Sequence, residues 1–298
     1  MQRDKRPKVS ERVAGAPISW GVCEVPGWGH QLEPDQVLSE MASLGLAATE
    51  LGPDGFLPAD PAAKVGILDA HGLRAVGGFM PILLHEPGSD PLPAADRFLD
   101  GCVASGADVM VLAAFTGVDG YDTRPVLDDL GWKALLANLD RVNELADDRG
   151  ITACLHPHFG TMVERRDEVD RVMQGSTIGL CVDTGHLAVG GADPVAITAT
   201  YAGRVRHVHL KDVDLQLAGQ VSAGELAFAT AVEQGMFRPL GDGDLDIATL
   251  VQALEAGGYS GWYVLEQDVK LALAPIGDGA GPLHDVGRSL EYLRGVGG

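Results

Sequence analysis

The sequence predicts an α/β protein built as a single (β/α)8 barrel, the TIM-barrel architecture. Short apolar runs typical of strands alternate with segments of helical spacing along the chain, as in parallel sheets whose strands are connected by helices. Four of these runs end directly before a side chain that can bind a metal: His156, Asp183, His209 and Glu266. Because all strands of a parallel barrel end at one rim, where enzymes of this fold carry their chemistry, the pattern predicts an active site there.

The eight expected strands are short runs rich in β-branched and other apolar residues, and most are bounded by glycine, proline or polar residues. In chain order they cover residues 17–22, 47–51, 73–79, 108–115, 151–155, 178–182, 205–208 and 262–265. Each is short enough to cross a barrel once and to place its last side chains at the rim.

The expected helices place apolar side chains three or four residues apart. In the first, residues 34–44, Val37, Met41 and Leu44 share one face. The others cover residues 61–71, 93–105, 131–149, 165–173, 194–201, 247–256 and 283–293. Glycine, which readily adopts the left-handed conformation that ends helices, follows four of them directly. These glycines are Gly45, Gly72, Gly150 and Gly257.

Residues 213–246 form a connection longer than ordinary loops of this fold, which predicts a lid or an inserted helix over residues 222–234. Residues 1–13 are polar and basic and are expected to form a flexible tail, with one barrel domain over 14–298. A doubly wound open sheet is the alternative architecture. No G-x-G-x-x-G motif follows the first expected strand to support its dinucleotide site.

Composition excludes some classes of partner. The formal net charge of −20 argues against nucleic acid and anionic membranes, and it favours a small-molecule substrate. No apolar run approaches the ~20 residues that cross a bilayer, and no signal peptide is visible. The four cysteines form no C-x-x-C pair and are expected to be buried, reduced thiols. A cytoplasmic protein is therefore expected.

The four strand-end side chains His156, Asp183, His209 and Glu266 are the candidate metal ligands. They occupy equivalent places after their strands, so they are expected to converge on one centre. A mixed nitrogen and oxygen set suits Mn²⁺, Co²⁺, Fe²⁺ or Zn²⁺ better than Ca²⁺.

Further candidates adjoin these ligands. His207 shares a face with His209 one layer deeper and is expected to orient a ligand. His186 is expected beside the metal, over a substrate. Lys211 is expected either to stabilise a developing oxyanion or act as an acid or base, or to form a rim salt bridge with Asp212.

Other rim residues are candidates for substrate binding. Trp20 and Trp28 are expected either to stack on a sugar-like ring or to pack loops, and Phe79 also ends a strand at the rim. Glu24 and Glu50 are candidates to accept from hydroxyl groups of a substrate, and Arg238 is expected either to hold an anionic group or to offset nearby acids. Gly241-Asp242-Gly243 is expected to form a turn, with projection of Asp242 over the barrel mouth as the alternative. No G-x-S-x-G nucleophile elbow is present.

Three motifs resemble those of the xylose isomerase-like TIM-barrel superfamily. They are Asp183-Thr184-Gly185-His186, the run from His207 to Asp212, and Glu266 after the last strand. The resemblance spans nearly the whole barrel and implies that Asp183, His209 and Glu266 hold a divalent metal. The superfamily's further ligand, a glutamate ending the fifth strand, is replaced here by His156.

The replaced segment resembles the inosose dehydratase branch of this superfamily. The similarity lies in His156-Pro157-His158 with Gly160-Thr161, in Ile18-Ser19-Trp20-Gly21 and in Glu266-Gln267-Asp268. The branch removes water from a keto-inositol with a metal such as Mn²⁺ or Co²⁺; Zn²⁺, Fe²⁺ and Mg²⁺ are the alternatives. Barrels of this group often pair, so the resemblance also allows a homodimer.

The resemblance implies a metal-dependent lyase acting on a cyclic polyhydroxy ketone such as scyllo-inosose. Glu266 or Lys211 is expected to take the proton α to the carbonyl, and His186 or His158 to protonate the leaving hydroxyl. The epimerases of the superfamily use two carboxylates on opposite faces of a carbon. Here imidazoles occupy one side, which favours elimination. A ketose isomerase or epimerase is the alternative enzyme, and a non-catalytic sugar-binding barrel ranks last.

Overall fold

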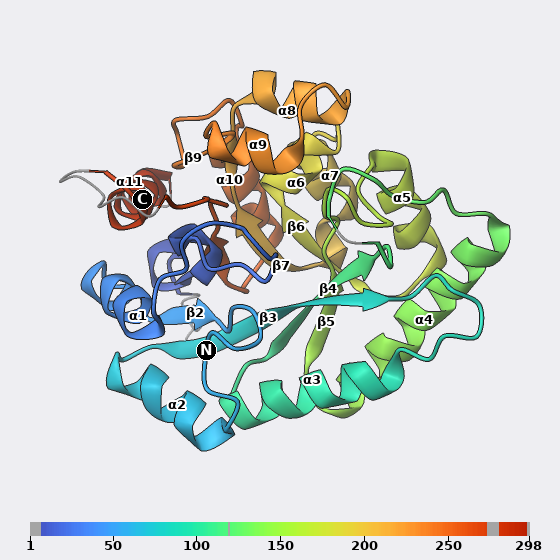
Figure 1. Cartoon of the computed structure of the whole chain (residues 1–298), viewed down its shortest axis with the longest axis horizontal. Helices are drawn as coiled ribbons and strands as arrows, with labels where there is room; N and C mark the ends of the chain where they lie inside the picture. The colour runs from blue at the N-terminus through green and yellow to red at the C-terminus, as the bar shows by residue number, and fades with distance from the viewer. Residues whose placement is uncertain (1–6, 119, 273–279, 297–298) are drawn as a thin grey trace, which may run out of the picture.

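The computed structural model describes residues 7–118, 120–272 and 280–296, and it confirms the (β/α)8 barrel (Figure 1). Eight parallel strands close in the order β1-β10-β7-β6-β5-β4-β3-β2. Their bounds are β1 (Val13–Gly15), β2 (Ala48–Glu50), β3 (Arg74–Leu83), β4 (Val109–Phe115), β5 (Thr152–Leu155), β6 (Gly179–Asp183), β7 (Val205–Leu210) and β10 (Tyr263–Leu265). Every carboxyl end therefore reaches the same rim.

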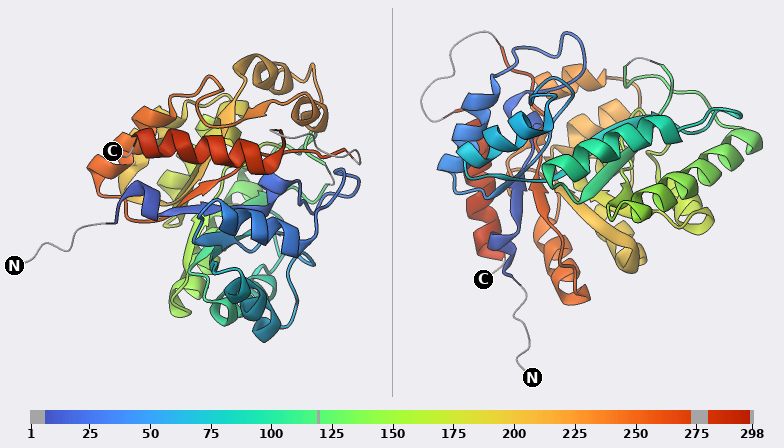
Figure 2. Two further views of the ribbon diagram at one scale, coloured as in Figure 1. Left: turned by 90° about the vertical axis from the view of Figure 1, so that its left-hand side faces the viewer. Right: turned by 90° about the horizontal axis from the view of Figure 1, so that it is seen from below.

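Helices surround the barrel, as both views of Figure 2 show. They are α1 (Pro34–Ser43), α2 (Pro61–Ala70), α3 (Leu92–Ser105), α4 (Asp129–Asp148), α5 (Arg166–Gly175), α6 (Thr184–Val189), α7 (Pro194–Tyr201), α10 (Ile247–Gly257) and α11 (Pro282–Val296). Several begin at a capping aspartate, such as Asp128 before α4, whose carboxylate accepts from a backbone N–H of the first turn. Within the described ranges, no helix has the length and hydropathy needed to span a bilayer.

The first strand lies earlier than predicted. Residues 17–22 were expected to form it, but Pro17–Trp20 is a 3-10 turn, η2, ended by Gly21 at φ 75°. Proline has no N–H to donate to a ladder and readily starts a helical turn. The strand is instead Val13–Gly15, paired in register with Tyr263–Leu265 of β10.

The segment expected to be a tail packs on the barrel in its described part. Val9–Glu11 forms a short 3-10 turn, η1, with Val9 buried. The buried guanidinium of Arg12 donates to the Gly261 carbonyl at 2.8 Å and to Glu255 of α10 at 2.6 Å. Residues 1–6 lie outside the described residues.

The connection after β7 forms two helices rather than the one predicted. It contains β8 (Asp212–Val213), α8 (Leu215–Ser222), α9 (Phe228–Glu233) and β9 (Phe237–Arg238), with β8 and β9 antiparallel. Gly224 at φ 71° follows α8 and separates it from α9. The two helices lie side by side near α6 in Figure 1 and share a small apolar core that includes Phe228, Phe237 and Trp28. The Phe228 N–H donates to Asp122 in the loop after β4 at 2.8 Å, which fastens the insertion across the rim.

Candidate metal centre

The structure brings the four predicted ligands together at the rim. Asp183 Oδ2 lies 3.1 Å from His156 Nε2 and 3.5 Å from His209 Nδ1, and this Nδ1 lies 3.1 Å from Glu266 Oε2. The ligand atoms of Asp183, His209 and Glu266 all lie within 4.8 Å of one another. The parallel register causes this convergence, because Asp183 of β6 pairs directly with His209 of β7.

The segment after β6 shows why each residue of its motif is needed. Asp183 Oδ1 accepts from the His186 N–H at 2.8 Å, which caps α6 and leaves Oδ2 facing the other ligands. Thr184 Oγ1 donates to the Lys211 carbonyl at 2.6 Å and accepts from the Lys211 N–H at 2.8 Å, so α6 is tied to the end of β7. A Cβ on Gly185 would lie 2.7 Å from that of Lys211, so only glycine fits there.

These residues fit a divalent cation. His209 Nδ1 is buried and has no hydrogen-bond partner among the described residues, although two carboxylate oxygens lie nearby. Its Nε2 lies 3.0 Å from Glu50 Oε1, so the proton belongs on Nε2 and the lone pair of Nδ1 faces the carboxylates. A set of imidazole and carboxylate donors is suited to Mn²⁺, Co²⁺, Fe²⁺ or Zn²⁺.

Glu50 lies beneath this centre and orients it. Its Oε1 accepts from His207 Nε2 at 2.8 Å as well as from His209, and all three side chains are buried. Although burial opposes ionisation, His209 and His207 hold the pKa of Glu50 far below its ordinary value. Glu50 was expected to bind substrate hydroxyls; it lines the cavity, but its Oε1 is used by these two histidines.

Replacing Glu50 by glutamine is expected to weaken divalent-metal binding by about 10–100-fold, the usual effect of losing a charged partner of a ligating histidine. Glutamine keeps the size and one acceptor oxygen, so the barrel should still fold. Calorimetric titration of the metal-free protein with Mn²⁺ measures the change. Glu24→Gln, an exposed carboxylate on the same cavity, is the matched control and should bind as the wild type does. Equal affinity in Glu50→Gln would refute the orienting role.

Lys211 is buried among carboxylates and an imidazole. Its Nζ lies 2.9 Å from Asp268 Oδ1, 3.0 Å from Glu266 Oε2, and 2.9 Å from the Nε2 of His186. Burial disfavours the ammonium, yet Asp183, Asp268 and Glu266 outweigh it and raise the pKa of Lys211 well above its ordinary value. Lys211 is therefore a cation fixed beside the metal ligands.

Lys211 and Asp212 do not form the rim salt bridge that was one of the expectations for Lys211. The Asp212 carboxylate instead accepts hydrogen bonds from backbone N–H groups of the loop that leads to α10. The residues it holds are Gly241, Gly243 and Leu245. Asp242 of this loop pairs with Arg288 of α11 rather than projecting over the cavity.

Two further imidazoles stack beside the centre. The rings of His158 and His186 lie 3.6 Å apart between centroids, at 29°. Burial, helped by His156 and Lys211, lowers the pKa of His158 to about 3, and burial with the neighbouring His158 lowers that of His186 well below its ordinary value. The Nδ1 of His158 lies 2.7 Å from the Phe159 carbonyl, which places its proton there and leaves Nε2 as an acceptor.

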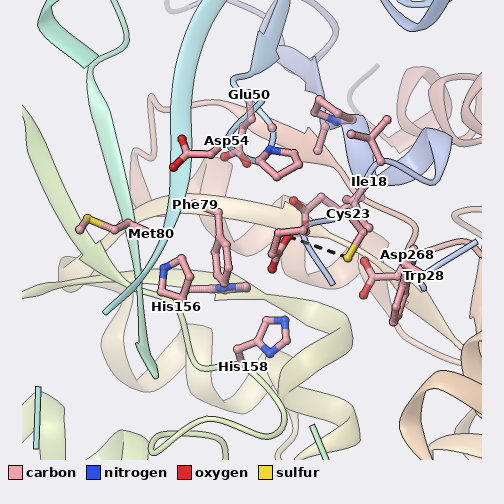
Figure 3. A pocket seen from close by; sticks show the side chains of 18 of the residues that line it. Ile18, Cys23, Trp28, Glu50, Asp54, Phe79, Met80, His156, His158 and Asp268 are labelled. Atoms are coloured by element: carbon pink, nitrogen blue, oxygen red, sulfur yellow. Dashed lines mark hydrogen bonds between the residues drawn. The ribbon is translucent and has the colours of Figure 1, made fainter. Parts of the chain in front are cut away.

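A cavity of about 630 Å³ opens above these groups (Figure 3). Polar groups at its base are His156, His158, Lys211, Glu266 and Asp268, and aromatic walls are supplied by Trp28, Phe79, Tyr121 and Phe228. Phe228 belongs to α9, so the insertion after β7 closes one side of the cavity. The volume lies in the range of small-molecule sites.

Among the predicted substrate-binding residues, Glu24 and Trp28 line this cavity, whereas Trp20 and Arg238 are engaged elsewhere. Trp20 is fully buried, and its indole N–H donates to Glu40 of α1 at 2.7 Å. Arg238 pairs with Asp214 inside the insertion at 3.2 Å. The predicted substrate-binding roles of Trp20 and Arg238 do not agree with these positions, because each side chain bonds a carboxylate outside the cavity.

Sequence reasoning did not assign a role to three cavity residues, Asp268, Tyr121 and Phe228. Asp268 lies two residues after Glu266, and this spacing puts both side chains on one face of an extended segment, so a signal existed. Burial raises the pKa of Asp268 to about 6, although Lys211 opposes this. Tyr121 comes from the loop after β4 and Phe228 begins α9, and no pattern marked either as a cavity residue.

Comparison with known proteins identifies the family of this barrel. The family described as xylose isomerase-like TIM barrel matches residues 38–295. An inosose dehydratase of Geobacillus thermodenitrificans is 31% identical over 290 residues, covering 94% of this chain and 95% of the relative. The rhizopine catabolism protein MocC of Rhizobium meliloti is 35% identical over 274 residues, covering 87% and 82%. A xylose isomerase domain containing protein of Salmonella typhimurium has a similar fold, with a TM-score of 0.69 at 17% identity over 97% and 99% of the two chains.

Proposed function

The chain belongs to the xylose isomerase-like TIM-barrel family, and from this premise we propose that it is a metal-dependent carbon–oxygen lyase that removes water from a cyclic polyhydroxy ketone such as scyllo-inosose. The observation that carries the proposal is the base of the cavity. There a candidate metal-ligand set adjoins one neutral imidazole and one buried ammonium. The similarity to inosose dehydratases supports the substrate class.

The metal would be held by His156, Asp183, His209 and Glu266, with Mn²⁺ or Co²⁺ proposed. When bound, a divalent cation supplies Lewis-acid polarisation of a substrate carbonyl, which acidifies the neighbouring C–H. Glu50 and His207 keep the imidazole of His209 in the orientation that this requires.

We assign proton abstraction to His158 and proton delivery to Lys211. His158 lines the cavity and carries its free lone pair on Nε2, so this nitrogen is the proposed acceptor of the α-proton. Glu266, whose pKa His209 and Lys211 lower to about 2 against the effect of burial, is in this proposal a metal ligand, so it is not assigned as the base. The C–H electrons form the C=C bond as the C–O bond breaks.

The departing hydroxyl needs a proton to leave as water. Lys211 is cationic, lines the cavity and is held in place by Asp268 and Glu266. It donates that proton and becomes a neutral amine, and the proton taken up by His158 returns to Lys211 after product release. The sequence predicted the opposite assignment, with Glu266 or Lys211 as the base and His186 or His158 as the acid. His186 stacks on His158 and bonds Lys211, so we propose that it positions both.

The test is turnover of scyllo-inosose by metal-stripped protein before and after addition of Mn²⁺ or Co²⁺, with the mass of the product determined. A metal-dependent product lighter by one water is expected. A product of unchanged mass would replace the lyase with an isomerase or epimerase. Absence of any reaction with added metal would reject this substrate.

A further inference from the structure

A buried thiol lies directly under the candidate metal centre. Cys181 precedes Asp183 by two residues on β6, so both side chains point into the barrel, Cys181 one layer deeper. It is fully buried. Its sulfur and one ring nitrogen each of His156 and His209 lie within 4.8 Å of one another. Each of the two histidines also adjoins Asp183 Oδ2, at 3.1 Å from His156 and 3.5 Å from His209, so each has a carboxylate neighbour as well as the thiol.

The two shared imidazoles have donor capacity left unused. The Nδ1 atoms of His156 and His209 are buried and have no hydrogen-bond partner among residues 7–118, 120–272 and 280–296, and that of His209 faces Glu266 at 3.1 Å and Asp183 at 3.5 Å. A buried nitrogen without a partner is unfavourable unless a ligand satisfies it. Donor atoms around a tetrahedral zinc ion with two imidazoles and one thiolate lie about 3.5 Å apart, so rotamer adjustments of about an ångström would close the set.

The chemistry of the two donor sets differs. Asp183 and Glu266 offer hard oxygen donors, which suit Mn²⁺, whereas a thiolate selects softer cations. We propose that His156, Cys181 and His209 form a thiophilic metal site for Zn²⁺ or Cd²⁺ beneath the oxygen-rich one, and that the two sites exclude each other because they share both histidines. The proposal uses the metal centre of the proposed function, but not its reaction.

A consequence is that the hardness of a cation decides how deep it sits in the barrel. Thiophilic cations bound to Cys181 displace Mn²⁺ and act as inhibitors. The chain offers a control in Cys154, an equally buried thiol on neighbouring β5 whose side chain hydrogen-bonds that of Cys181. The Cys154 sulfur contacts the Met110 carbonyl at 3.7 Å, and it belongs to none of the candidate donor sets among the described residues.

The experiment titrates metal-free protein with Cd²⁺ and records the ultraviolet absorption that arises from charge transfer between a thiolate and cadmium. We expect this band in the wild type and in Cys154→Ser, and its loss in both Cys181→Ser and Cys181→Ala. In parallel, Cd²⁺ affinity should fall at least about tenfold in Cys181→Ser, while Mn²⁺ affinity stays within about twofold of the wild type. Circular dichroism establishes that each variant is folded.

Two results would overturn the proposal. One is a wild type that binds Cd²⁺ without the charge-transfer band, since the cation would then be held by nitrogen and oxygen alone. The other is a band that disappears in Cys154→Ser but persists in the Cys181 variants. Cadmium NMR of the wild type, which needs no variant, reports a thiolate ligand independently. None of these measurements depends on turnover, so they test the thiophilic site even when the dehydratase assay shows no reaction.

Discussion

Replacing Asp183 by asparagine is expected to remove metal binding and turnover together while the barrel still folds. Asp183 Oδ2 is the point at which the candidate ligands His156 and His209 meet, and the amide would present no charge there. Loss of a Lewis acid amounts to several kcal/mol of the barrier, so turnover should fall at least about 10³-fold. Metal content after dialysis and the rate of scyllo-inosose turnover are the measurements.

The substitution separates function from folding because Asp183 also caps α6. Asparagine caps a helix nearly as well as aspartate, so the Oδ1 contact with the His186 N–H should survive. Asp193→Asn is the matched control, since Asp193 caps α7 in the same way, by accepting from the Val195 and Ala196 N–H groups, but is exposed. A variant of Asp183 that kept wild-type metal content and rate would contradict the assignment of this carboxylate as a ligand.

Replacing Lys211 by methionine is expected to lower kcat by about 10²–10⁴-fold, the range of general acid catalysis, while the protein still binds metal. Methionine retains the length of the side chain and removes only the cationic donor. The rate should stay low at saturating substrate and saturating Mn²⁺, which distinguishes loss of a proton donor from weakened binding. Lys133→Met, an exposed lysine of α4, is the control and should react at the wild-type rate.

The same variant has a second expected effect, on stability. Lys211 neutralises Asp183, Glu266 and Asp268, and removing one partner of a buried ion pair typically destabilises a protein by about 3–5 kcal/mol. Metal-free Lys211→Met should therefore unfold at a lower temperature than the wild type, and saturating Mn²⁺ should restore part of the loss. An unchanged melting temperature together with full turnover would show that Lys211 has neither role.

The barrel itself was predictable because its signal is local and repeated. Apolar strand runs and glycine-terminated helices recur along the chain, and seven of the eight strands overlap their predicted ranges. The exception, β1, is three residues long, and it precedes a run that is equally apolar but begins with Pro17. A strand this short is defined by its partner, here β10, rather than by its own composition.

The insertion after β7 shows a different limit. Its length marked it as a functional connection, and the structure places Phe228 of α9 on the cavity. The helix breaks at Gly224, whose φ is 71°. The pairing of β8 with β9 and the contact of Phe228 with Asp122 depend on residues distant in the chain. Periodicity within one segment carries no information about such partners.

The sequence by itself determined the barrel, the family resemblance and the four rim side chains that converge, because parallel strands of a closed barrel bring their carboxyl ends together whatever the loops do. Only the tertiary structure decided what each polar side chain bonds. Glu50 turned out to orient His207 and His209, and Trp20 bonds Glu40 in the packing of α1. The protonation of the buried groups likewise depends on desolvation and on charges from other strands, which exist only once the chain is folded.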